Sequence, residues 1–388
     1  MDAGFLSNKT ILILSPQAWG NMMLAKHHYA LELAKRGNEV YFLNPPDNDH
    51  WSWGKGSKRI IIRSSSQANL FIIEQKLYFP YDLKFHGRWL YNRLIRKQIR
   101  DILRIIPRPV DLIWSFDLGN LFPLSFFSSR IFKVFHPVDE PQDGIAILAA
   151  KGAHILFSVT KEITEKYKHL PLPAHIIHHG LADEFLSDKT GERNDRIKAG
   201  MSGNLLRADL DRINLLRIIE ESPEVEFHFY GSYAGGQSNI GAATDQESIR
   251  FIEKMKSAKN TVLHGVLPTT RLAEELNGMD LLLICYDINR DQSRGTNYHK
   301  VMEYLSTGKV IVSNNISSFA GEPELVRMTA GRTDNKGFSE LFRETVRNLD
   351  TYNVPALKSR RIEFARDNTY SRQLNRIEEK ISQMRENN

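Results

Sequence analysis

Lys300 and Glu303 are the first residues of this sequence whose types and spacing point to chemistry. On a helix, residues three positions apart share one face. A lysine near a helix N-terminus can bind phosphate, and a neighbouring carboxylate can accept hydrogen bonds from the hydroxyls of a ribose. An ordinary helical salt bridge is the commoner explanation of this spacing, so the pair alone leaves both interpretations open.

Two glycine-containing loops add a second indication of a phosphate site. Gly203 and Asn204 follow the strand-like run Ile197–Ser202, and Arg207 comes shortly after them. The glycine allows backbone to approach a bound group closely, and an arginine can fork onto a pyrophosphate. Gly231 ends the next strand-like run in the same way. A glycine after a strand is common, and Arg207 as a plain surface cation is the alternative.

These residues need a parallel sheet to bring them together, and the first half of the chain has the pattern of one. The run Thr10–Leu14 predicts a buried strand, helical spacing follows up to Gly37, and Glu39–Leu43 predicts a second strand. Strand, helix and strand make the βαβ unit of a doubly wound α/β sheet. Further strands are predicted at Ile60–Arg63, Leu70–Glu74, Val110–Ser115, Ile131–His136, Ala153–Ser158 and His175–His178.

The second half repeats this pattern, so two Rossmann-like domains are expected. Strands are predicted at Ile197–Ser202, Glu226–Tyr230, Thr261–His264, Leu281–Ile284 and Val310–Ser313. Ligands bind at the carboxyl ends of such strands, where the glycine loops and the helix with Lys300 stand. A polar stretch places the boundary between residues 1–188 and 189–358, and residues 359–388 predict one helix that packs back across the domains.

Composition excludes several other classes of protein. The hydrophobic fraction of 41% and the charged fraction of 25% are those of an ordinary globular protein. Cys285 is the single cysteine and stands in an apolar run, which favours burial over catalysis and excludes an internal disulfide. Met1–Thr10 lacks the pattern of a signal peptide, so a cytoplasmic protein is expected. Although the pI is about 9.1, the second half is nearly neutral, which argues against nucleic-acid binding.

The basic excess lies in the first half, in residues 84–108. This stretch has eight basic side chains against one acidic residue, Asp101, interleaved with aromatic and aliphatic residues. It predicts a basic amphipathic helix suited to an anionic membrane surface, which would make the protein peripheral on the inner face of the plasma membrane. A solvated helix over an ordinary core stripe has equal weight.

The stretch Arg294–Val312 resembles the signature T-N-x-x-K-x-x-E-Y-L-x-x-G-K-x-V-V of bacterial GT-B glycosyltransferases of the group-1-like and teichuronic-acid type, which build cell-surface polysaccharides. Thr296, Asn297, Lys300 and Glu303 occupy its fixed positions. The resemblance continues, in order, through the first strand and helix, His136–Asp139, His179–Phe185, Gly203–Asp211 and Phe229–Gly231.

This resemblance implies an α/β GT-B fold, with two Rossmann-like domains facing a cleft. The first domain would hold a glycan or lipid-linked acceptor, and the second a UDP- or GDP-sugar donor, with no metal and no other cofactor. Arg207 and Lys300 would contact the diphosphate and Glu303 the ribose. Gly231 would allow the nucleotide to approach closely. The activity implied is metal-independent transfer of a hexose.

Departures from the family pattern, which also include Tyr298-His299 in place of the usual proline, leave the sugar and the stereochemistry open. Many retaining relatives have a glutamate where this chain has Gly295, and the interdomain turn has His179 in place of asparagine. An inverting transfer needs a general base, for which Asp139 is the best candidate and His136 the next, although Asp139 could equally be a helix cap. A nucleotide-sugar epimerase or hydrolase of the same fold and a non-catalytic carbohydrate-binding relative remain alternatives.

Overall fold

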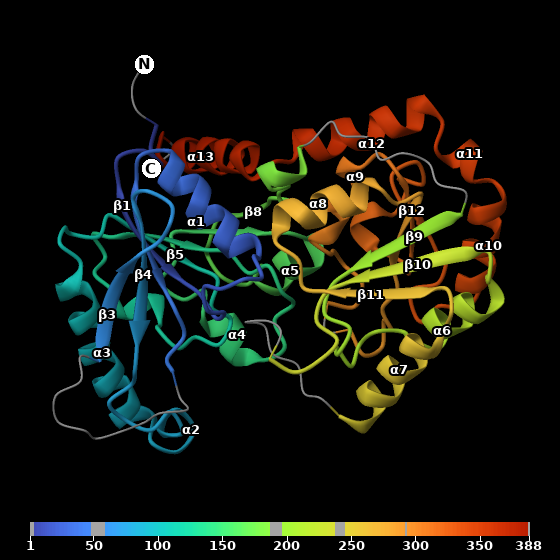
Figure 1. Cartoon of the computed structure of the whole chain (residues 1–388). Coiled ribbons are helices and arrows are strands. Elements are labelled where there is room, and N and C mark those ends of the chain that lie inside the picture. Colours follow the sequence, from blue (N-terminus) through green and yellow to red (C-terminus); the bar gives the residue numbers. More distant parts are fainter. Residues whose placement is uncertain (1–3, 48–58, 187–195, 237–244, 292, 387–388) are drawn as a thin grey trace. The chain divides into compact units, whose positions relative to one another are not determined.

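The computed structural model describes residues 4–47, 59–186, 196–236, 245–291 and 293–386 (Figure 1). The chain forms two compact units: Met1–His178 with Gln373–Asn388, and His179–Arg372. The predicted boundary at residue 188 falls outside the described residues. The two units meet earlier in the chain, between His178 and His179. The last residues return to the first unit.

The first unit contains an eight-stranded sheet in the order β3-β4-β2-β1-β5-β6-β7-β8. All its strand pairs are parallel except β3 with β4. The strands are β1 (Thr10–Leu14), β2 (Glu39–Leu43), β3 (Ile60–Ser64), β4 (Leu70–Gln75), β5 (Leu112–Ser115), β6 (Phe132–Phe135), β7 (Ile155–Ser158) and β8 (Ala174–Ile176). The central strands are apolar on both faces and buried, as the sequence predicts.

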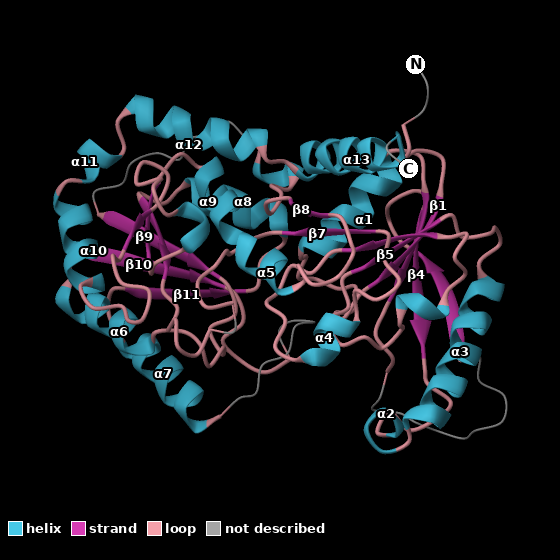
Figure 2. Ribbon diagram, turned by 180° about the vertical axis from the view of Figure 1, so that it is seen from behind, coloured by secondary structure: helices cyan, strands magenta, loops and turns pink. Residues whose placement is uncertain are grey.

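Helices and short 3-10 turns connect these strands. They are α1 (Ala25–Lys35), α2 (Leu83–His86), α3 (Arg88–Ile105), η1 (Leu124–Phe126), α4 (Gly144–Leu148) and α5 (Lys161–Lys166). The C-terminal helix α13 (Tyr370–Glu386) lies beside α1 (Figures 1 and 2), where Arg36 pairs with Glu378 at 3.3 Å. Asn375 also accepts a hydrogen bond from Arg36 at 2.6 Å, so the end of the chain is anchored to this unit.

The second unit has a six-stranded parallel sheet in the order β11-β10-β9-β12-β13-β14. Its strands are β9 (Ile197–Ser202), β10 (Val225–Tyr230), β11 (Thr261–Gly265), β12 (Leu281–Ile284), β13 (Val310–Ser313) and β14 (Arg327–Met328). Figure 2 shows helices on both sides of this sheet. They are η2 (Asp183–Phe185), α6 (Arg212–Glu221), α7 (Gln246–Ser257), α8 (Thr269–Asn277), α9 (Lys300–Ser306), η3 (Ser317–Phe319), α10 (Phe338–Arg347), α11 (Leu349–Tyr352) and α12 (Pro355–Asp367).

The predicted α/β class with two Rossmann-like units is confirmed, and two helix predictions need correction. The basic stretch 84–108 is not one helix: Gly87 ends α2 and precedes α3. The C-terminal stretch is not one helix either, because the chain leaves helical geometry at Asn368, which separates α12 from α13. Neither glycine nor asparagine favours a helix interior, and these residues mark the breaks in the sequence.

Candidate functional site

The structure brings the predicted phosphate-binding residues of the second unit together at the carboxyl ends of β9, β10 and β12. Lys300 is the first residue of the short helix α9, and its side chain is buried. Its Nζ donates to the backbone oxygen of Ser202 at 2.5 Å and to the Tyr286 hydroxyl at 2.7 Å. Burial works to lower the pKa of Lys300, but its interactions with Tyr286 and Tyr304 raise it overall, so the ammonium is retained.

Gly203 and Gly231 leave the space that the loops after β9 and β10 and the Lys300 side chain need to lie so close together. Both have a positive φ, +133° and +146° respectively. A Cβ on Gly203 would lie 2.7 Å from Lys300 Nζ, and one on Gly231 would lie 1.9 Å from the carbonyl oxygen of Gly203. Gly231 therefore has a role that the sequence did not predict: it lets the loops after β9 and β10 touch each other.

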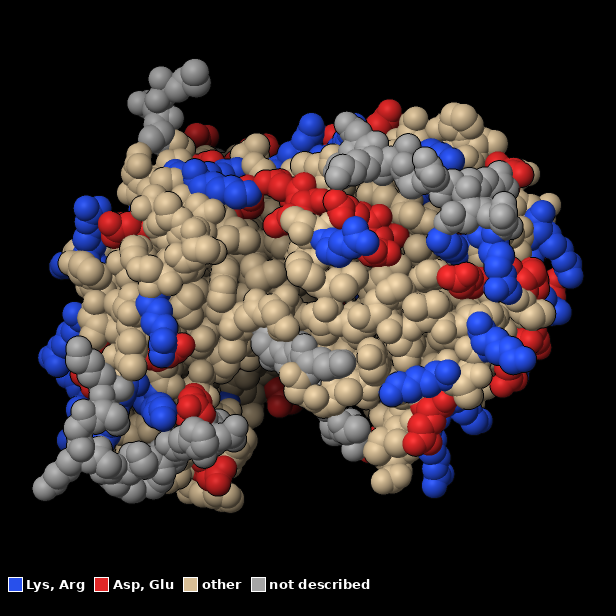
Figure 3. All heavy atoms as spheres, viewed as in Figure 1, with Lys and Arg blue, Asp and Glu red and all other residues tan. Residues whose placement is uncertain are grey.

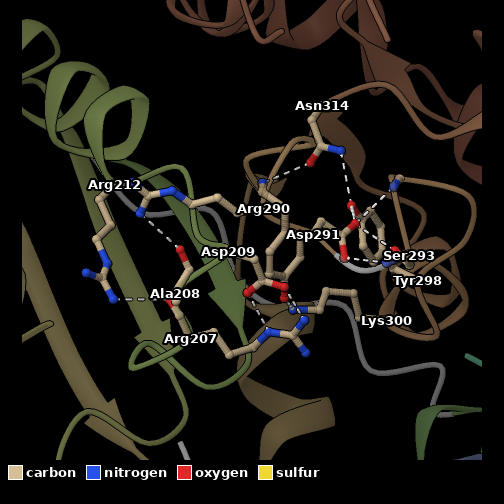
Figure 4. A network of polar contacts seen from close by, with 12 residues as sticks. Arg207, Ala208, Asp209, Arg212, Arg290, Asp291, Ser293, Tyr298, Lys300 and Asn314 are labelled. Carbon is tan, nitrogen blue, oxygen red and sulfur yellow. Dashed lines mark hydrogen bonds and ion pairs between the residues drawn. The ribbon is translucent and has the colours of Figure 1, made fainter. Parts of the chain in front are cut away.

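Arg207 is held beside Lys300 by a carboxylate. Its guanidinium donates from Nε to Asp209 Oδ1 at 2.7 Å and also pairs through Nη2 with the second carboxylate oxygen. Figure 4 shows the Arg207 side chain reaching Asp209 with Lys300 alongside. Arg207 and Lys300 lie 5.4 Å and 5.0 Å from the Tyr286 ring centroid, so two cations flank one ring. The Asp209 hydrogen bond raises the pKa of Arg207, although burial opposes this.

Glu303 lies one helical turn from Lys300 and is the titratable group of this site. Its side chain keeps 17% exposure, and its Oε1 is 3.9 Å from His299 Nε2. Burial raises the pKa of Glu303 from 4.5 to about 7, although Lys300 partly lowers it. Glu303 therefore changes charge near neutral pH, which the sequence did not indicate.

The other predicted donor residues shape the loops around this site. Asn204 Oδ1 accepts from the Leu206 backbone N–H at 2.9 Å and so fixes the turn after Gly203. The Thr296 backbone oxygen accepts from the Ser318 hydroxyl at 2.6 Å. Thr296 and Asn297 are both buried in the loop that leads into α9. All eight residues predicted for the donor side thus lie on the loops and helix at one edge of the second sheet.

Sequence reasoning missed Asp291, which organises the loop before α9. Its carboxylate accepts from the Ser293 hydroxyl at 2.6 Å, the Gly295 backbone N–H at 2.9 Å and the Tyr298 hydroxyl at 2.6 Å. Gly295 has φ +64°, and a Cβ there would lie 2.5 Å from the backbone oxygen of Asn315. The spacing Asp-x-Ser-x-Gly is the signal that could have indicated such an Asx-type turn.

In the first unit, the two predicted catalytic residues, His136 and Asp139, have different surroundings. His136 follows β6 and is fully buried among aromatic rings, where its Nδ1 accepts from Trp114 Nε1 at 3.3 Å. Asp139 is exposed on the loop beyond it. Both stay candidates, but the packing of His136 is that of a core histidine.

Lys26 is a second residue that sequence reasoning missed. It lies at the start of α1, is buried, and donates to Gln17 Oε1. Burial lowers its pKa, while the charges of Asp139 and Asp117 partly restore it. This buried cation therefore faces the loops that follow β5 and β6, at the carboxyl edge of the first sheet.

Comparison with known proteins identifies the fold. No protein-family model matches the sequence, and no characterised protein matches it by sequence. Sucrose-phosphate synthase from Thermosynechococcus elongatus matches with a TM-score of 0.71 at 9% identity, over 98% of this chain and 100% of that one. The fold is GT-B.

Two further solved structures agree with this result. Anabaena HepE, in complex with UDP and glucose, matches with a TM-score of 0.66 at 11% identity, over 96% of this chain and 99% of its own. The UDP-forming α,α-trehalose-phosphate synthase from Burkholderia vietnamiensis gives a TM-score of 0.65 at 12% identity, over 97% and 100% of the two chains. At these identities the similarity establishes the GT-B fold alone.

Two structural observations bear on metals and membranes. Among the residues described, no group of three or more His, Cys, Asp or Glu side chains is arranged to hold a metal ion. Within the same residues, none of the helices combines the length and apolarity needed to cross a membrane.

Proposed function

We propose that this chain is a glycosyltransferase that moves a hexose from a UDP- or GDP-sugar to a glycan or lipid-linked acceptor in bacterial cell-surface polysaccharide biosynthesis. The observation that carries the proposal is the pair of cations, Arg207 and Lys300, around Tyr286, with Glu303 one turn away on α9. Two cations suit a diphosphate, and an adjacent carboxylate suits a ribose diol. The GT-B neighbours solved with UDP and glucose support the same donor class.

In this proposal the cations act on the leaving group. As the bond between the sugar and the diphosphate breaks, negative charge grows on the departing phosphate oxygens. Lys300 is already held by Ser202 and Tyr286, and Arg207 by Asp209, so little reorganisation is needed when that charge develops. Such fixed cations can take the place of a divalent metal, which supports metal-independent transfer.

The first unit would hold the acceptor. Asp139 would accept the proton of the attacking hydroxyl in an inverting transfer, or orient that hydroxyl in a retaining one. Asp139 suits this role better than His136, because it is exposed and its charge interacts with the buried cation Lys26.

The basic stretch 84–108 supports membrane attachment through only part of its length. Ile95, Ile99 and Ile102 are buried in the core of the unit, whereas Phe85 and Trp89 are 60% and 74% exposed. Figure 3 shows basic side chains gathered along the edge formed by α3. We therefore place the lipid contact at the exposed aromatic residues of α2 and the first turn of α3, with the arginines engaging anionic headgroups.

A donor panel tests the proposal. The full-length protein is incubated with radiolabelled UDP-, GDP- and TDP-sugars, and both nucleotide release and sugar transfer to lipid-linked acceptors are measured. We expect release from one UDP- or GDP-sugar, reduced about a hundredfold or more in Lys300→Ala. Lys336→Ala is the matched control, since Lys336 is 90% exposed in the same unit. Equal release by both variants would show that the cation site is not the donor site.

A further inference from the structure

The first unit contains a pocket that the proposed function does not yet use. It lies at the carboxyl ends of β1, β2 and β5, where Leu14 and Leu43 are the last residues of their strands and Asp117 follows β5. Its volume is about 180 Å³. This edge of a parallel sheet is where ligands bind in open α/β folds.

The walls of the pocket are mostly apolar. Leu14, Leu43, Phe122 and the rings of Pro45 and Tyr81 line it. Ser15 also belongs to the lining, but its hydroxyl already exchanges hydrogen bonds with the Gln17 backbone. A cavity of roughly 150 Å³ lined by apolar side chains holds one benzene molecule. The pocket therefore has room for one six-membered ring.

Asp117 is the single carboxyl group of the lining. It is 8% exposed, and its Oδ2 accepts from the Leu121 backbone N–H at 2.7 Å. Burial raises the pKa of Asp117, while hydrogen bonds from the loop backbone and the charge of Lys84 partly lower it. Lys26 and Lys84 are the cations that interact with this carboxyl group, so its charge is partly offset inside the protein. A ligand need not bring a positive charge.

We propose that this pocket binds an aromatic or alicyclic alcohol, a ring that is apolar except for one hydroxyl group that hydrogen-bonds to Asp117. A hexose ring does not fit this chemistry, because several of its hydroxyls would lie against Leu14, Leu43 and Phe122 without partners, and each would lose its hydration. An aromatic or alicyclic alcohol leaves no polar group unsatisfied.

The test uses 4-fluorophenol and fluorobenzene as probes, with binding to the full-length protein followed by ¹⁹F NMR. Both should bind, and 4-fluorophenol should bind about tenfold more tightly because of the hydrogen bond to a carboxylate. Methyl β-glucopyranoside should not displace either probe. Absence of binding, equal affinity of the two probes, or displacement by the glucoside would each overturn the proposal.

Variants separate the pocket from the fold and from the donor site. Asp117→Asn keeps the shape, so fluorobenzene should still bind while the preference for 4-fluorophenol shrinks several-fold; an unchanged preference would exclude Asp117 as the partner. Leu121→Trp should fill the pocket and abolish binding of both probes. Asp101→Asn, on the exposed face of α3, is the control. UDP-sugar cleavage, measured separately, tests the proposed function, so its failure would leave a positive probe result standing.

Discussion

The titration of Glu303 gives the sharpest test of the proposed donor site. A carboxylate accepts hydrogen bonds from both hydroxyls of a ribose, whereas a protonated carboxyl group loses part of this capacity. With a pKa of about 7, the ionised fraction of Glu303 rises from about one tenth at about pH 6 to about nine tenths at about pH 8. If the ionised form alone binds the ribose well, donor affinity should rise about tenfold over this range.

Calorimetry with UDP-glucose measures this directly. UDP-glucose is preferred to UDP because its diphosphate has no terminal group that takes up a proton near neutral pH. In Glu303→Gln the affinity should fall by about 1–3 kcal/mol at high pH and should not vary with pH. His299 Nε2 lies 3.9 Å from the Glu303 carboxylate, so His299→Asn, which leaves Glu303 in place, is the control and should retain the wild-type pH profile. A flat profile in the wild type, or an unchanged profile in Glu303→Gln, would refute the assignment.

The raised pKa of Glu303 also determines how the free energy of unfolding changes with pH. Because the folded state binds the Glu303 proton more tightly than the unfolded state, folding is favoured at low pH and this contribution is lost as pH rises from 4.5 to about 7. The loss is on the order of 3 kcal/mol. Urea unfolding of the wild type and of Glu303→Gln across this range measures it, and the variant should show a smaller decrease.

Three further outcomes are expected. Arg207→Ala should weaken UDP-glucose binding by about 1–3 kcal/mol, and Asp209→Asn by less, because it only frees the arginine; calorimetry on both variants and the double variant would show whether the two effects are coupled. Sugar transfer should continue in EDTA, and a strict need for added Mn²⁺ or Mg²⁺ would instead indicate a metal-held donor. In vesicle sedimentation, binding should rise with anionic lipid and fall with salt, and Trp89→Ser with Arg93→Ser should weaken it; binding unaffected by lipid charge would favour a purely structural α3.

The strands were predictable because their side chains follow simple rules. Continuous apolar runs such as Thr10–Leu14 and Leu281–Ile284 are buried on both faces of a parallel sheet, and their observed bounds equal the predicted ones. The proximity of the residues predicted for the donor side was predictable for the same reason: they follow strands whose carboxyl ends meet at one edge. The boundaries of the two units were harder to predict. Residues from Gln373 onward belong to the first unit through contacts with residues that are distant in the sequence.

The sequence could not predict the hydrogen-bond partners of each charged group. Lys300 was expected either to pair with Glu303 or to bind phosphate. In the structure its ammonium donates to Ser202 and Tyr286, which come from other segments of the chain.

Gly295, which stands where many relatives have a glutamate, is also explained by contacts that the sequence does not show. On sequence grounds it left the donor sugar and the stereochemistry of transfer open. In the structure its positive φ and the nearby Asn315 carbonyl exclude a side chain, and its N–H is bound by Asp291. Since Asp291 also binds the hydroxyl of Tyr298, two residues before Lys300, the glycine belongs to a turn that positions the cation. The substitution is therefore a change in how the loop is built, and it does not by itself argue against catalysis.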